Sequence, residues 1–192
     1  MQLVLASTSP FRREILTRLG IPFTATAPDC DETPLPGESA LATAVRLARS
    51  KAQSLADRYP AALIIGSDQV ALLDDEQIGK PASLEHAVEM LQRMSGRTTR
   101  FHTALALYNN VNGRWRESVE ITAVTMRRLD EATIRRYLQR EPDALMCAGS
   151  AKSEGLGGAL IERVESRDPN ALIGLPLFDL VGMLAAEGME VV

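Results

Sequence analysis

The sequence has few of the residues that build structural metal sites or disulfides. Its 192 residues include only two cysteines, Cys30 and Cys147, and two histidines, His86 and His102. None of the four lies at a zinc-ligand spacing from another. We therefore expect both cysteines to be reduced thiols that bind no metal.

A basic excess and long apolar runs are also missing. The formal net charge is -4, whereas proteins that bind polynucleotides through their phosphates are usually basic. The apolar start at residues 2 to 6 is too short for a signal peptide, and no later segment approaches the ~20 apolar residues of a membrane span. We expect a cytoplasmic protein that binds neither nucleic acid nor membrane. The sequence leaves a homodimer open.

Length and pattern indicate one α/β domain, with a two-lobed domain as the alternative. The chain is 45% hydrophobic and long enough for one substantial core. Strands are predicted at residues 2 to 6, 21 to 27, 61 to 68, 98 to 108 and 118 to 129, and a further strand follows the glycine- and serine-rich part of residues 148 to 164. Helices are predicted at residues 10 to 19, 40 to 59, 84 to 94, 131 to 139 and 175 to 188. This order predicts a mixed, twisted sheet flanked by helices.

The turn from the first strand into the first helix is a candidate phosphate site. Ser9 fits an N-cap and Pro10 the first helical position. Arg12 then lies in the first turn, where the helix dipole disfavours a cation by roughly 0.3 to 1 kcal/mol. A phosphate bound by the helix N–H groups, the hydroxyls of Ser7 and Ser9 and an arginine would offset that cost. The alternative is a capped surface helix with Arg12 and Arg13 in solvent.

Carboxylates form two further candidate sites. Asp68 ends the apolar run at residues 61 to 68, and the carboxyl end of a buried strand is where open α/β sheets bind ligands. A turn cap is the alternative for Asp68. The loop with Asp29, Asp31 and Glu32 offers oxygen ligands to Mg²⁺ or Mn²⁺, which proteins bind with one or two carboxylates plus substrate phosphates. Solvated acids are the alternative there.

Two lysines and one glutamate complete the candidates. Lys51 follows Ala48 and precedes Leu55 at helical spacing, so it interrupts an apolar stripe, and an inward lysine needs an anionic partner. Lys80 lies between a glycine and a proline, in a turn that restricts its backbone and so makes it a candidate. The alternative is an ordinary lysine on a surface turn. Glu154 lies in a glycine-rich loop. Its carboxylate either recognises a nucleobase or is a solvated acid or a helix cap.

A resemblance to a known family joins these candidates. In order, and over nearly its whole length, the chain contains the segments LASTSPFRREIL, DETP, RLARSKA, GSDQV, GKP, AGSAKSEGLGG and GLPL. Together they resemble the Maf family of nucleoside triphosphate pyrophosphatases. The resemblance implies an α/β fold like that of inosine triphosphate pyrophosphatases, with a deep cleft, a divalent metal (Mg²⁺ or Mn²⁺) and hydrolysis between the α and β phosphates.

The resemblance also implies roles for individual residues. Asp68 is implied to be the proton acceptor, activating a water molecule that attacks the α-phosphorus. Glu32, with Asp68, is implied to lie at the metal. The residues implied to surround the phosphates are Ser7, Arg12, Lys51 and Lys80.

Three positions that separate substrate classes in the family are Phe11, Gln69 and Glu154. Members acting on thymidine and uridine triphosphates tend to carry Arg, Thr and Gln there, whereas the 7-methyl-GTP branch carries an aromatic residue, Gln and Glu. Phe11 replaces the first arginine of the SPRR found in many members, which leaves Arg13 without an assigned role. An aromatic face on the cationic methylated base gains on the order of 0.5 to 2 kcal/mol, and a carboxylate accepts hydrogen bonds from guanine. The chain resembles the 7-methyl-GTP branch.

Other functions remain as alternatives. Within enzymes, they are a pyrophosphatase for pyrimidine or other modified triphosphates, and hydrolysis at a terminal phosphate. In a different class is a nucleotide-binding regulator, since the family is also associated with arrest of cell division.

Overall fold

The computed structural model describes residues 1 to 192, which form two compact units. The first unit comprises Met1–Gln69, His102–Glu120 and Asp168–Val192, and the second comprises Val70–Phe101 and Ile121–Arg167. Three long strands have residues in both units: β3 (Ala62–Leu73), β5 (Thr98–Asn109) and β6 (Arg114–Met126).

The strands form a mixed sheet, as predicted. Its order is β2-β1-β3-β5-β6-β7, and β4 pairs with β3. Strand β1 pairs in parallel with β2 and β3, whereas the β3–β4 and β6–β7 pairs are antiparallel. The remaining strands are β1 (Gln2–Ala6), β2 (Thr24–Thr26), β4 (Glu76–Ile78) and β7 (Ile161–Glu165). The predicted α/β class is confirmed.

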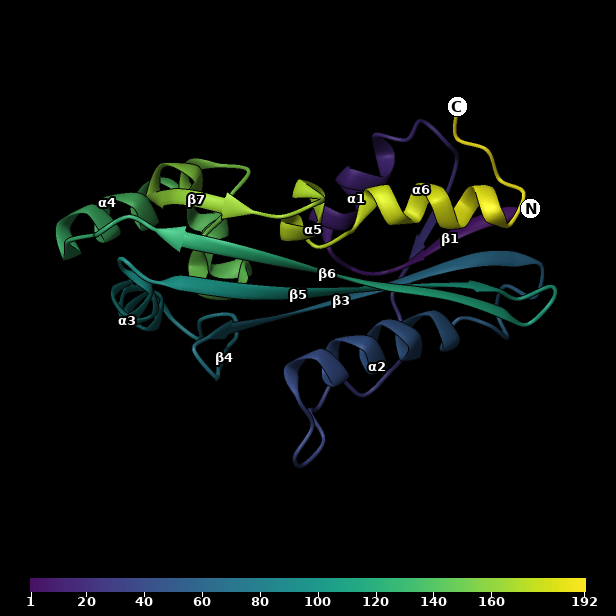
Figure 1. Cartoon of the computed structure of the whole chain (residues 1–192), viewed down its shortest axis with the longest axis horizontal. Helices are drawn as coiled ribbons and strands as arrows, with labels where there is room; N and C mark the ends of the chain where they lie inside the picture. The colour runs from purple at the N-terminus through teal and green to yellow at the C-terminus, as the bar shows by residue number, and fades with distance from the viewer. The chain divides into compact units, whose positions relative to one another are not determined.

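In the first unit, helices cover both faces of the strands (Figure 1). Helix α2 (Ala40–Gln53) lies on one side of β1 and β3. On the other side lie α1 (Pro10–Thr17), α5 (Pro169–Ile173) and α6 (Leu177–Ala186). This arrangement explains the uninterrupted apolar run at the start of β3, because a strand covered on both faces has no polar side.

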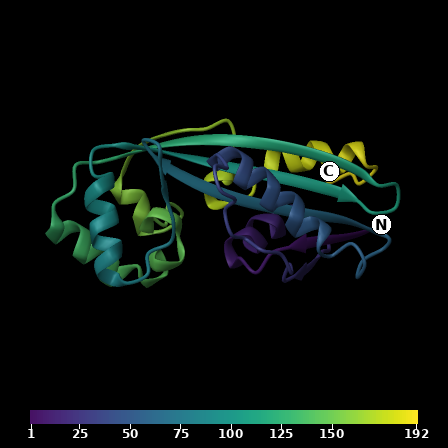
Figure 2. The same cartoon turned by 90° about the horizontal axis from the view of Figure 1, so that it is seen from below.

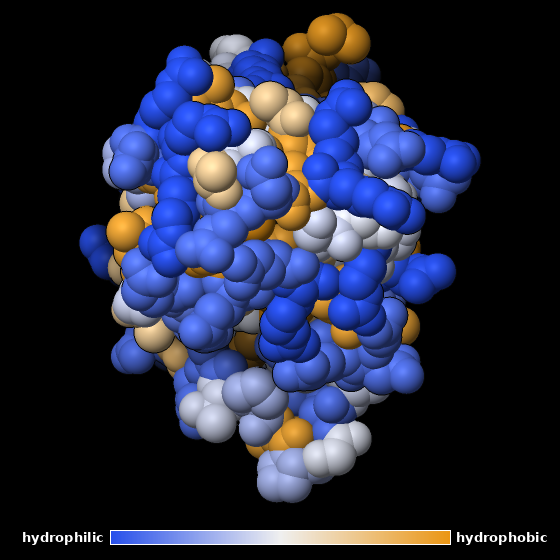
Figure 3. Space-filling view, turned by 90° about the vertical axis from the view of Figure 1, so that its left-hand side faces the viewer, coloured by the Kyte–Doolittle hydropathy of each residue, from blue (hydrophilic) through white to orange (hydrophobic).

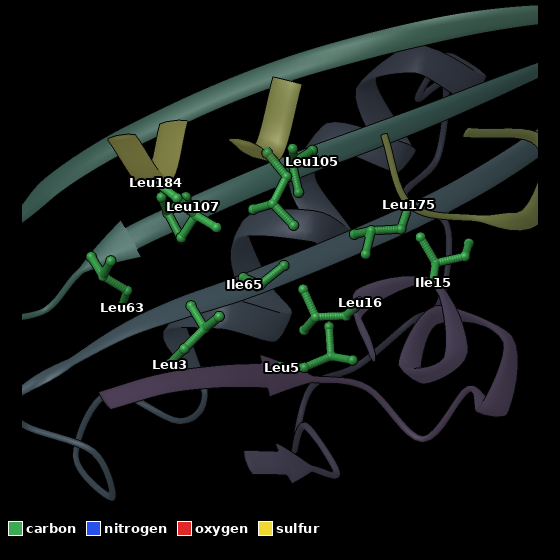
Figure 4. Close-up of a cluster of buried hydrophobic side chains, with 11 residues drawn as sticks. Leu3, Leu5, Ile15, Leu16, Leu63, Ile65, Leu105, Leu107, Leu175 and Leu184 are labelled. Carbon is green, nitrogen blue, oxygen red and sulfur yellow. The ribbon is translucent and has the colours of Figure 1, made fainter. Parts of the chain in front are cut away.

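The core of this unit consists mainly of leucine and isoleucine. Side chains from β1, β3 and β5 meet those of α1 and α6 in one cluster (Figure 4). Leu5, Ile15, Leu16 and Leu184 in this cluster have no exposed surface. Because Leu175 joins it just after α5, the core also fixes the chain segment that follows that helix.

In the second unit, helices and short 3₁₀ segments pack together beside the ends of the long strands. Helix α3 (Leu84–Met94) packs against α4 (Glu131–Arg140) and against η2 (Ala148–Ser150) (Figure 2). The other 3₁₀ segments are η1 (Pro142–Met146) and η3 (Leu156–Leu160). The surface at this end is mostly hydrophilic, with separated apolar patches (Figure 3).

Helix ends follow the predicted caps. The Ser9 side chain accepts a hydrogen bond from the backbone N–H of Arg12, and α4 begins after Asp130. Helix α2 ends at Gln53, short of the predicted residue 59. The Ser54 hydroxyl there donates to the Lys51 carbonyl at 2.9 Å, which competes with the helical hydrogen bonds. No helix has both the length and the apolar character to cross a membrane.

The placement of Asp68 at the end of its strand was wrong. Strand β3 continues to Leu73, because residues 70 to 73 are apolar and residues 71 to 73 pair with β4. The strand that ends nearby is β1, whose pairing with β3 stops at Leu5 and Ile65. Asp68 therefore extends beyond the carboxyl end of β1 while remaining inside β3.

The sequence also missed two elements and misjudged the length of another. Strand β4 and helix α5 were not predicted, and both are short. Strand β2 is confined to Thr24–Thr26 within the predicted residues 21 to 27. The loop between β2 and α2 has no helix or strand, as expected from its prolines and acids.

Candidate functional site

The centre of the candidate site is an ion pair between Lys51 and Asp68 in the first unit. Lys51 is 5% exposed and Asp68 7% exposed. Lys51 Nζ lies 2.6 Å from Asp68 Oδ1. The predicted inward lysine with an anionic partner is therefore confirmed.

Gly66 allows this contact, because a Cβ atom there would lie 2.0 Å from the Ala48 carbonyl oxygen of α2. Only glycine lets α2 pack this close to β3.

Burial and the surrounding charges act in opposite directions on Asp68. Burial raises the pKa of its carboxyl group, which disfavours the ionised form. Lys51, by charge and hydrogen bond, and Arg12, by charge, lower that pKa, while the charge of Glu32 raises it. The net pKa is above the ordinary value for aspartate. A carboxyl group of this kind, held beside cations, can exchange a proton with a ligand.

Glu32 shares the same ammonium group. Lys51 Nζ lies 3.2 Å from Glu32 Oε1, and the Glu32 side chain is 59% exposed. Asp31 has a different function, because its Oδ1 accepts a hydrogen bond from the Thr33 backbone N–H at 2.9 Å. The predicted acidic loop thus brings one carboxylate to the Lys51–Asp68 pair.

The donor set fits a divalent metal only if a ligand supplies further oxygens. No three or more histidine, cysteine, aspartate or glutamate side chains gather at one place in the chain. Glu32 and Asp68 are two carboxylates around one ammonium group. Mg²⁺ is commonly bound by one or two carboxylates together with substrate phosphates and water. Two carboxylates are thus sufficient for such an ion when a polyphosphate is bound.

The predicted turn at the start of α1 contributes Arg12 and Ser7. Arg12 is half-buried, and burial lowers the pKa of its guanidinium, although the charges of Asp68 and Glu32 raise it. Ser7 is buried and its Oγ accepts a hydrogen bond from the Ser9 N–H at 3.1 Å. The Ser7 hydroxyl hydrogen remains for a ligand.

The other residues of this turn differ in exposure. Ser9 uses its hydroxyl oxygen as the helix cap, at 3.3 Å from the Arg12 nitrogen. Phe11 is half-buried, whereas Arg13 is exposed. Of the two adjacent arginines, Arg12 is thus the less exposed, and its charge acts on Asp68.

Helix α5, which was not predicted, holds two of the site residues. Arg12 Nε donates to the Gly174 carbonyl at 2.8 Å. Gln69 Nε2 donates to the carbonyls of Ala171 at 2.9 Å and Leu172 at 3.1 Å, and to the Thr103 hydroxyl at 2.9 Å. The amide nitrogen of Gln69 is thereby fully used, and only its Oε1 can contact a ligand.

Lys80 and Glu154 belong to the second unit. Both act electrostatically on Cys147, with Glu154 raising the pKa of the thiol and Lys80 lowering it. Burial is the largest cause, and the pKa of Cys147 is raised to about 11. Within the second unit, Lys80 and Glu154 are thus near one cysteine. Their place in a site with Asp68 stays a prediction.

Cys30 is a neighbour of the first unit's charged residues that the sequence did not point to. It is half-buried, and burial raises the pKa of its thiol. The charges of Lys51, Glu32 and Asp68 also act on it. A lone cysteine in a loop carries no sequence signal for such a position.

The chain is similar to known proteins over nearly its whole length. A family model described as "Maf-like protein" matches residues 2–187. A protein of Chromobacterium violaceum named 7-methyl-GTP pyrophosphatase is 72% identical over 191 residues, covering 100% of this chain and 99% of that protein. Proteins of the same name from Neisseria gonorrhoeae and Vibrio vulnificus are 56% and 50% identical, and each is covered over 97% of its length.

Among solved structures, the Ham1 protein of Staphylococcus aureus is similar over 66% of this chain and 72% of that chain, with a TM-score of 0.48 and 14% identity. The sequence matches extend over nearly the whole chain, including both units. The chain belongs to the family of Maf-like proteins.

Proposed function

We propose that this protein hydrolyses a nucleoside triphosphate, with 7-methyl-GTP as the favoured substrate, to the monophosphate and pyrophosphate. The observation that carries the proposal is the buried pair of Lys51 and Asp68 with Arg12 beside it. The names of three relatives at 50% to 72% identity support the same reaction. Buried cations around a carboxylate are suited to a polyanionic substrate and a water nucleophile.

In the proposed reaction, Asp68 is the general base. Lys51 is bonded to Asp68 Oδ1, which leaves Oδ2 to receive a proton from water. The water oxygen forms a bond to the α-phosphorus as the bond from that phosphorus to the bridging oxygen breaks, and pyrophosphate leaves. The raised pKa of Asp68 makes it a stronger base than an ordinary aspartate.

The substrate phosphates are proposed to bind Arg12, Lys51 and the Ser7 hydroxyl, with Lys80 as a fourth contact. Arg12 has terminal N–H groups beyond the Nε that Gly174 binds. Cations held in place before the reaction stabilise charge on the leaving group at little reorganisation cost.

Glu32 and Asp68, together with oxygens of the substrate phosphates, would hold a divalent metal, Mg²⁺ or Mn²⁺. Such an ion would neutralise charge on the phosphates. Glu32 is suited to this part because its side chain is largely exposed and close to Lys51.

The base is proposed to contact Phe11, Gln69 and Glu154. Because the amide nitrogen of Gln69 is used by α5 and Thr103, its free Oε1 offers an acceptor. Acceptors match the N–H donors on guanine's Watson-Crick edge, and Glu154 would add a charged one. Phe11 would stack on the cationic methylated ring.

A panel assay tests the proposal directly. Purified protein with Mg²⁺ or Mn²⁺ is given 7-methyl-GTP, GTP, UTP and dTTP, and both pyrophosphate and orthophosphate are measured. We expect pyrophosphate, released fastest from 7-methyl-GTP. Orthophosphate as the product would indicate cleavage at a terminal phosphate, and no release from any substrate would favour a nucleotide-binding regulator.

The two units would be lobes of one domain, since the relatives match the whole chain. A cytoplasmic location fits a nucleotide substrate.

A further inference from the structure

The carbonyl of Gly174 is bonded by two side chains from distant parts of the chain. Arg12 Nε donates to it at 2.8 Å. Ser67 Oγ lies 2.9 Å from it and 2.8 Å from the Ala104 carbonyl oxygen, so the single hydroxyl hydrogen is shared between these two carbonyl groups. Gly174 begins the GLPL segment, which none of the proposed contacts with substrate uses. Ser67 immediately precedes Asp68 and has no exposed surface. A single carbonyl group therefore links the residue next to the proposed base with a proposed phosphate ligand.

The backbone conformation at position 174 and the space around it both require glycine. Its φ angle is +119°, in the left-handed region that favours glycine. A Cβ atom there would lie 3.2 Å from Arg12 Nε. Both the conformation and the space therefore require glycine where the Arg12 side chain meets the end of α5.

Side chains bind carbonyl groups at the end of α5, where the regular helical hydrogen bonds stop. The Ala171 carbonyl also accepts the backbone N–H of Gly174 at 3.0 Å. Thr103 and Gln69 bond to the Ala171 carbonyl, and Arg12 and Ser67 bond to that of Gly174. The position of each carbonyl is therefore fixed from two sides.

We propose that Ser67 is a positioning residue for phosphate binding, acting through the Gly174 carbonyl to hold the Arg12 guanidinium in place. Arg12 Nε is fixed by this carbonyl, so the plane of the guanidinium is set and its terminal N–H groups are left for an anion. Ser67 itself has no exposed surface and is not proposed to contact the substrate. The inference rests on the proposed function, in which Arg12 binds the phosphates.

The test is a double-mutant cycle read by binding of pyrophosphate with Mg²⁺, measured by calorimetry. Ser67→Ala in the wild-type background is expected to weaken pyrophosphate binding on the order of ten-fold. In an Arg12→Lys background, which keeps the charge but lacks the Nε donor, the same change is expected to have little further effect. Equal losses in both backgrounds would overturn the proposal, as would unaltered binding by folded Ser67→Ala.

Thr103→Val is the matched control. Thr103 is also fully buried, and its hydroxyl donates to a carbonyl of the same helix, that of Ala171. Pyrophosphate has no base, so contacts of Gln69 do not enter the measurement. If general loosening of α5 were the cause, Thr103→Val would weaken binding as much as Ser67→Ala, which would contradict a specific effect through Gly174.

Two further measurements keep the outcomes separate. If Ser67→Ala does not fold, Ser67→Cys keeps the size of the side chain with a much weaker donor and gives the same test. Wild-type protein that binds pyrophosphate but cleaves no triphosphate would refute the proposed function alone. If the wild-type protein cleaves a triphosphate but Ser67→Ala weakens pyrophosphate binding equally in both backgrounds, only the proposed role of Ser67 is refuted.

Discussion

Lys51 Nζ and Asp68 Oδ1 lie 2.6 Å apart, and both side chains are almost fully buried. Burying one of these charges without the other would cost several kcal/mol. The pair therefore sets two properties together: it keeps a buried carboxylate in the fold, and it opposes the effect of burial on the pKa of that carboxylate.

Asp68→Asn is expected to remove nearly all pyrophosphate release. The amide cannot take a proton from water, and a general base typically contributes on the order of 10² to 10⁴ in rate. The amide oxygen can still accept a hydrogen bond from Lys51, and Glu32 keeps a negative charge 3.2 Å from that ammonium group, so the melting temperature should show a folded protein. Full activity in a folded Asp68→Asn variant would exclude Asp68 as the base.

Lys51→Gln should move the acid limb of the pH–rate profile to higher pH. Activity requires ionised Asp68 and is lost as the pH falls through its pKa. Lys51 lowers that pKa, so removing the cation raises it further. The measurement is kcat/KM against pH. Arg49→Gln is the control, because Arg49 lies on the same helix but pairs with Glu117, and its profile should keep the wild-type acid limb.

The inward position of Lys51 could be predicted because its evidence is local. A lysine within an apolar stripe of a helix faces the core whatever the rest of the fold does, and its need for an anionic partner follows. The Ser9 and Asp130 caps were predictable for the same reason, since a cap depends on residues within one turn.

The link between Arg12 and Gly174 could not be predicted. These residues are 162 positions apart, and the acceptor is a backbone carbonyl. Every residue has such a carbonyl, so residue type gives no signal. Helix α5 is also too short for a clear apolar period. The length of β3 was missed because a buried strand shows no alternation to indicate where it ends.

Phe11→Arg combined with Glu154→Gln should lower the preference for 7-methyl-GTP over UTP. An arginine repels the cationic base, and glutamine is a weaker acceptor than a carboxylate. We expect the ratio of the two kcat/KM values to fall about ten-fold or more. Glu162→Gln, at an exposed position of β7, is the control and should keep the ratio. An unaltered preference in the double variant would mean that other residues read the base.

Gly66→Ala should destabilise the protein strongly, because the added methyl group meets backbone atoms of α2. Its Cβ would lie 2.0 Å from the Ala48 oxygen and 2.9 Å from the Ala52 nitrogen, and neither can rotate away as a side chain would. Overpacking of this kind costs about 1 to 3 kcal/mol or more, and moving α2 outward would also separate Lys51 from Asp68. Gly182→Ala, in α6 with no atom near its Cβ position, should instead stabilise by about 0.5 to 1 kcal/mol. Urea unfolding measures both changes, and equal stability of the two variants would contradict the close packing of α2 on β3.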